Sequence, residues 1–109
     1  MKKLTQDEQT TLARIAKAMG HPVRITILKF LAEQESCFFG DIYEVLPMAK
    51  ATVSQHLKEL KEAGLIQGEI EPPKVRYCIN RERWDMAKSL YAEFFNTYNP
   101  EQDGKCCKD

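Results

Sequence analysis

Apolar residues recur with helical spacing in the middle of the chain, between Lys50 and Gly64. Val53, Leu57 and Leu60 fall at positions i, i+4 and i+7, on one narrow stripe of a helix with 3.6 residues per turn. We expect this stripe to anchor the helix while its polar surface faces outward. Gly64 favours the left-handed conformation found after helix ends, so the helix is predicted to end there.

The segments around this helix complete a recognisable order of elements. Residues 40–46 form a short amphipathic helix candidate, and residues 47–49 form a tight connection to the helix that begins at Lys50. Residues 65–70 and 75–79 then read as two strands joined by a tip that contains Lys74. This order predicts a winged helix-turn-helix, a mainly α fold with a small β-hairpin.

Two longer amphipathic helices are predicted near the ends of the chain. After the hairpin the pattern is strongly aromatic, and a domain this small has little intrachain core left to cover it. We therefore expect these terminal helices to pair with a second copy, although burial within the chain is the alternative. The predicted stripes are Leu12, Ile15, Ala16 and Met19 in the first helix, and Trp84, Ala87, Tyr91, Phe94, Phe95 and Tyr98 in the last.

The polar surface of the helix that begins at Lys50 suits duplex DNA. Short hydrogen-bonding side chains can read base edges, and lysine or arginine side chains can contact phosphates. Net charge is zero, but this helix and the hairpin are each locally positive. His56 borders the apolar stripe, so it either faces DNA or packs against the preceding helix. The predicted DNA-binding residues are Lys50, Thr52, Ser54, Gln55, His56, Lys58, Lys61, Lys74 and Arg76.

Length and composition set the remaining bounds. The chain has 109 residues, of which 43% are hydrophobic, enough for one small core. We expect one domain over residues 1–98 and a flexible tail over residues 99–109. No apolar run or leader pattern predicts a membrane span or a signal peptide, so a cytoplasmic protein is expected, with its four cysteines as thiols rather than disulfides. Two histidines and no glycine-rich phosphate loop argue against an enzyme.

Residues 19–31, 52–60 and 63–66 resemble the ArsR/SmtB family of winged-helix repressors, which leave DNA when they bind metals or metalloids. The resemblance spans nearly the whole chain and implies a homodimer formed by the terminal helices. Two recognition helices in such a dimer would enter successive major grooves roughly 34 Å apart, on an inverted-repeat operator. One departure is Ala49, which stands where the family usually has a serine that caps the recognition helix.

The same resemblance bears on the inducer. The last helix has no histidine between residues 81 and 98, so the family's zinc site there cannot form. The segment around Cys37 resembles an arsenic-sensing pattern of two cysteines separated by one residue, but Phe39 stands in place of the second cysteine.

The adjacent tail cysteines Cys106 and Cys107 offer the missing ligands, and the neighbouring lysines favour their thiolate forms. We predict a three-sulfur site of Cys37, Cys106 and Cys107 for As(III) or Sb(III). A trivalent organoarsenical needs only the tail pair. The alternatives are a thiol redox or persulfide response, a tail whose cysteines bind nothing, and a winged-helix module that binds protein. Cys78, in the second strand, is interpreted as a packing residue.

Overall fold

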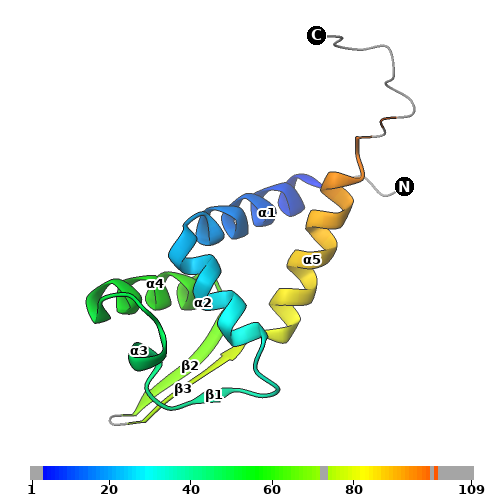
Figure 1. Ribbon diagram of the computed structural model, residues 1–109. Coiled ribbons are helices and arrows are strands. Elements are labelled where there is room, and N and C mark those ends of the chain that lie inside the picture. Colours follow the sequence, from blue (N-terminus) through cyan, green and yellow to red (C-terminus); the bar gives the residue numbers. More distant parts are fainter. Residues whose placement is uncertain (1–3, 72–73, 99, 101–109) are drawn as a thin grey trace.

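The computed structural model describes residues 4–71, 74–98 and 100. None of the helices in these ranges is long and apolar enough to cross a membrane. Helices α1 and α5 lie beside each other, and the β2–β3 hairpin projects away from them (Figure 1). The elements are α1 (Gln6–Met19), α2 (Pro22–Ala32), β1 (Phe38–Phe39), α3 (Ile42–Val45), α4 (Lys50–Glu62), β2 (Ile66–Glu71), β3 (Lys74–Ile79) and α5 (Arg81–Phe95).

The sheet has three antiparallel strands in the order β1-β3-β2. Strands β2 and β3 form the predicted hairpin, with the register running from Ile66 opposite Ile79 to Glu71 opposite Lys74. Strand β1 was not predicted, because two residues are too few to show an alternating pattern. It pairs with β3 and joins the segment before α3 to the hairpin.

The core lies where α2, α3, α4 and the sheet meet. The predicted α4 stripe of Val53, Leu57 and Leu60 is confirmed, since all three side chains are buried. Ile27 from α2 and Ile42 from α3 are fully buried in the same cluster. Helix α4 is thus held in the core along one edge, and the opposite side of the helix remains in solvent.

The predicted stripe on α1 is partly wrong. Leu12 and Ile15 are buried, but Ala16 is exposed and Ala18 is buried in its place. The cause is that α1 contacts α2, α4 and α5 together. The buried face therefore follows 12, 15 and 18 rather than the face that includes Ala16.

The aromatic stripe on α5 divides into two parts. Trp84 and Tyr91 are half-buried, with Ala87 buried between them. Phe94 and Phe95, by contrast, are 47% and 68% exposed, and their rings contact each other edge to face. The far end of α5 therefore presents aromatic surface that the described part of the chain leaves exposed.

Gly68 in β2 is required by its neighbour across the sheet. Its partner is Tyr77, whose buried ring lies where a Cβ would be; that atom would come within 2.5 Å of the ring. We expect Gly68→Ala to lower the free energy of unfolding by about 1–3 kcal/mol, as overpacking does in closely packed sites. Urea denaturation measures this change. Gln67→Ala, at an exposed neighbouring position, is the control, and an equal loss there would refute the steric explanation.

Candidate nucleic-acid interface

Helix α4 begins without a side-chain cap. Its N-cap residue Ala49 makes no side-chain hydrogen bond, as the sequence predicts, whereas Asp41 caps α3 by accepting a 2.9 Å hydrogen bond from the Tyr43 backbone N–H. The ammonium group of Lys50 lies 5.1 Å from the centre of the Tyr43 ring. This cation–π contact holds the start of α4 against α3.

The other end of α4 is closed by backbone hydrogen bonds. Gly64 has φ +82°, a left-handed conformation that glycine adopts without steric cost. The Gly64 N–H donates to the Lys61 carbonyl at 3.0 Å, and the Leu65 N–H donates to the Leu60 carbonyl at 3.1 Å. This pair of bonds is the Schellman motif, which turns the chain from the helix directly into β2.

The outward side of α4 is polar. The predicted base-reading side chains Thr52, Ser54 and Gln55 are all exposed, and so are Lys58 and Lys61. The Gln55 amide donates a 3.4 Å hydrogen bond to Glu59 one turn later. With Lys50, which is also exposed, the structure places six predicted DNA-binding side chains in solvent on one helix.

A hollow of about 470 Å³ lies between this helix and the wing. It joins the exposed side of α4 to Tyr77 in β3, the residue that follows Arg76 along the strand. The hollow is lined by Ala51, Ser54, Gln55, Leu57, Lys58, Lys61 and Tyr77.

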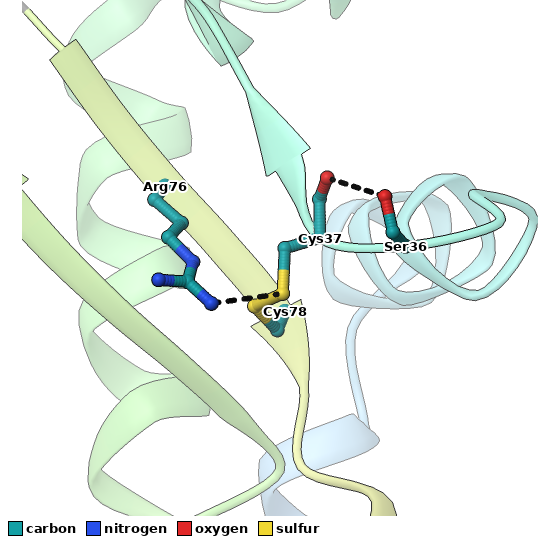
Figure 2. The surroundings of a disulfide bond; sticks show 4 residues. All are labelled: Ser36, Cys37, Arg76 and Cys78. Atoms are coloured by element: carbon teal, nitrogen blue, oxygen red, sulfur yellow. Dashed lines mark hydrogen bonds between the residues drawn. A yellow bond between two sulfur atoms is a disulfide. The ribbon is translucent and has the colours of Figure 1, made fainter.

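On the wing, Arg76 is exposed and makes two contacts with the segment before α3. Its guanidinium lies 5.4 Å from the centre of the Phe39 ring, and it donates a 3.8 Å hydrogen bond to Cys37 Sγ (Figure 2). Lys74 pairs with Glu71 through the backbone, and its side chain lies outside the described structure. Arg76 therefore connects the predicted phosphate-binding wing to Cys37.

His56 does not belong to the outward surface, which corrects its place in the predicted DNA-binding set. It is 9% exposed, and its Nδ1 accepts a 3.0 Å hydrogen bond from Arg24 Nε in α2. Its ring also lies 4.3 Å from that of His21. Of the two orientations that the sequence left open, His56 takes the one that packs α4 against α2, because it adjoins the buried stripe.

This packing predicts a pH dependence of stability. Burial, His21 and Arg24 lower the pKa of His56 below 6.5, while Glu59 opposes the shift. The unfolded chain then takes up the proton more readily, so the free energy of unfolding should fall as pH drops below about 6.5. One proton limits the slope to about 1.4 kcal/mol per pH unit. Denaturation at pH 7.5, 6.5 and 5.5 tests this, and an unchanged slope in His56→Gln would assign the effect elsewhere.

A disulfide joins Cys37 to Cys78, with the two Cα atoms 4.4 Å apart (Figure 2). Two expectations are thereby corrected: these two cysteines are not thiols in this structure, and Cys78 is more than a packing residue. The β1–β3 register explains the contact, since Phe38 pairs with Tyr77 and the next pair along is 37 and 78. The pairing of the two cysteines could not be predicted from the sequence, because β1 itself was not recognised as a strand.

The described side chains do not form a metal site. Nowhere in these ranges do three or more His, Cys, Asp or Glu residues gather closely enough to hold a metal ion. Cys106 and Cys107 lie outside the described residues. The predicted three-sulfur site therefore stays a prediction, and it requires the Cys37–Cys78 bond to be reduced before Cys37 can act as a ligand.

Comparison with known proteins identifies the family. Residues 21–67, from before α2 into β2, match the model described as bacterial regulatory protein, arsR family. The solved structure of the cadmium metal-sensor CMTR from Mycobacterium tuberculosis is 31% identical, with a TM-score of 0.52 over 74% of this chain and 80% of that one. The chain belongs to the ArsR family.

Two further comparisons concern a curated regulator and the fold. The transcriptional regulator YgaV of Escherichia coli K12 is 28% identical over 81% of this chain and 86% of its own. A homodimeric winged helix-turn-helix DNA-binding domain from Mycobacterium bovis, described as a possible ArsR-family regulator, is 22% identical, with a TM-score of 0.56 and full coverage of both chains. Other curated regulators match over 46–66% of their lengths.

Membership of the ArsR family confirms the sequence-based prediction of a winged helix-turn-helix transcriptional regulator rather than an enzyme. The family match covers α2, α3, α4 and the first residues of β2. The matched residues therefore include the whole of α4 and its exposed side chains. The likeness to the Mycobacterium bovis domain, at 22% identity, supports the fold alone.

Proposed function

We propose that this ArsR-family regulator is a homodimeric repressor that binds an inverted-repeat operator through α4 and the β2–β3 wing. The observation that carries the proposal is the division of α4 into a buried stripe and an exposed polar side. The exposed side offers the hydrogen-bonding side chains of residues 52, 54 and 55, which lie between Lys50 and Lys58 in the sequence. The wing adds Arg76. These groups suit base edges in a major groove and the phosphates that flank it.

Dimerisation is supported by the exposed aromatic end of α5. Phe94 and Phe95 at the end of α5, together with Tyr98 just beyond it, are between 47% and 68% exposed. A second copy related by a two-fold axis would cover these side chains with their own equivalents. The homodimeric domain from Mycobacterium bovis has the same fold. The dimer would place its two α4 helices on DNA half-sites that are about one turn of the duplex apart.

The inducer is proposed to be a thiophilic ion, with As(III) or Sb(III) bound by Cys37, Cys106 and Cys107 as the specific hypothesis. Soft trivalent ions favour thiolate ligands. The named relatives include a cadmium metal-sensor, which supports a soft-ion inducer without identifying it. Since Cys37 is bonded to Cys78, this response requires reduced protein.

Fluorescence anisotropy with a labelled fragment of the protein's own promoter tests this function. Affinity should fall steeply with salt concentration, because each phosphate contact releases counterions. Stoichiometric arsenite, but not zinc, should then release the reduced protein from the fragment. A Cys106→Ser/Cys107→Ser variant should bind DNA and ignore arsenite.

The contrary results separate the alternatives. Weak binding with little salt dependence would favour a protein-interaction module. Binding that arsenite does not affect would refute the three-sulfur site but leave the repressor intact.

The disulfide specifically favours a second candidate, a repressor that responds to thiol redox chemistry. Disulfides in bacterial cytosol are usually transient or redox-sensing, so a cross-link inside the DNA-binding unit suits regulation.

A further inference from the structure

The Cys37–Cys78 bond lies where it can control the DNA-binding unit. Residues 38–77, between the two cysteines, contain β1, α3, α4, β2 and most of β3. The bond therefore joins the start of this unit to its end. Apart from the disulfide and the side-chain contacts of Arg76, β1 pairs with the wing through two residue pairs in the described structure, Phe38 with Tyr77 and Phe39 with Arg76.

A cavity gives small molecules access to the bond. It has a volume of about 670 Å³, within the range of pockets that hold small ligands. Its walls include both cysteines together with Ser36, Arg81 and Trp84. Both cysteine side chains are half-buried rather than enclosed. A small thiol can therefore reach the sulfur atoms without unfolding of the core.

We propose that Cys37–Cys78 is a reversible thiol–disulfide switch that low-molecular-weight thiols open through this cavity, and that opening weakens DNA binding by the wing. The proposal rests on the proposed DNA-binding function. It assigns the switch to the β1–β3 cross-link, within the described structure, and does not involve the tail cysteines.

The geometry indicates which sulfur leaves. Arg76 donates to Cys37 Sγ at 3.8 Å, and a nearby cation stabilises a thiolate (Figure 2). The external thiolate therefore attacks the sulfur of Cys78. An S–S bond forms between them, the Cys37–Cys78 bond breaks, and Cys37 leaves as a thiolate with the bonding electron pair.

A second external thiolate completes the reduction. It attacks the external sulfur of the mixed disulfide, so the two external thiols become joined and Cys78 leaves as a thiolate. The two external thiols lose two electrons in total, and the two cysteines gain them. The protons that the external thiols release pass through solvent, where they are available to the two cysteines.

Opening the bond affects the wing in two ways. The Cys37 thiolate forms an ion pair with Arg76, which offsets a positive charge proposed to contact phosphate. In addition, the segment of Cys37 and β1 loses its covalent link to β3, so this segment, which leads into α3, is held less firmly to the wing. Both effects lower affinity for DNA, and coupling of this kind typically changes affinity by about 5–150-fold.

The test uses full-length protein in a Cys106→Ser/Cys107→Ser background, so that only Cys37 and Cys78 can exchange thiols. The oxidised protein is titrated with glutathione redox buffers. Alkylation followed by peptide mass spectrometry measures reduction of each cysteine, while anisotropy measures DNA affinity. We expect the affinity to fall by at least about 5-fold in step with reduction, and to recover on reoxidation.

Two variants separate the parts of the switch. Cys37→Ser/Cys78→Ser in the same background should show no response to glutathione. Arg76→Gln should still be reduced, but the affinity difference between its two redox states should shrink. An unchanged difference would refute the role of Arg76.

Other outcomes overturn the proposal. A disulfide that persists in excess reduced glutathione is structural, and complete reduction without a change in affinity refutes the switch. Absence of DNA binding in both redox states would instead refute the proposed function, and with it the control of the wing. The two failures are therefore distinguishable.

Discussion

Lys58→Glu is expected to weaken binding to the operator by about 100-fold. The side chain is exposed on α4 and lines the hollow between α4 and the wing. In a dimer the substitution removes two proposed phosphate contacts and puts a carboxylate beside the DNA backbone twice. A loss of about 1.4 kcal/mol in each half-site gives the 100-fold change. Anisotropy at about 0.1 M salt measures it, and the salt dependence should become shallower.

A matched control separates position from net charge. Lys29→Glu changes the charge by the same amount on α2, where Lys29 forms only an exposed 3.4 Å ion pair with Glu33. Exposed pairs of this kind contribute little stability. We expect Lys29→Glu to bind DNA far better than Lys58→Glu. Equal losses in the two variants would show that net charge, rather than the surface of α4, governs binding.

Leu60→Ala should lower the free energy of unfolding by about 2–5 kcal/mol, the cost of truncating a fully buried leucine. The side chain is 0% exposed and belongs to the stripe that anchors α4 in the core. Since α4 presents the predicted DNA-binding residues, the loss of packing should also reduce the fraction of protein able to bind.

Urea denaturation measures this loss of stability. Leu60→Met should cost less, because it largely conserves the buried volume. Glu62→Ala, at an exposed position on the same helix, should change stability by no more than about 0.5 kcal/mol. A small effect of Leu60→Ala would show that α4 is not held by its apolar stripe.

The elements that could be predicted from the sequence are those whose apolar residues recur with a clear period. Helix α4 and its buried stripe followed from helical spacing, and Gly64 marked its end. The hairpin followed from two strand-like runs with a proline-containing tip. Strand β1 escaped detection because two residues carry no period, and Ala18 replaced Ala16 because several helices pack on α1 at once.

For the candidate DNA-binding site, the sequence predicted which side chains of α4 are exposed, because exposure follows from the helical period. Thr52, Ser54 and Gln55 are exposed as expected, although their contacts with DNA remain proposals. The cysteine pairing was not predictable, because it depends on the β1–β3 register rather than on sequence spacing. The contact between Arg76 and Cys37 depends on the same register. Cys106 and Cys107, in the predicted tail, lie outside the described residues.

We propose that α4 and the wing form the surface that binds DNA. The most direct test is to map amide chemical shifts by NMR while a promoter fragment is added to isotope-labelled protein. We expect the largest changes in α4, at the exposed positions from Thr52 to Lys61, and around Arg76 in β3. Changes confined to α1 and α5, with α4 unaffected, would contradict it.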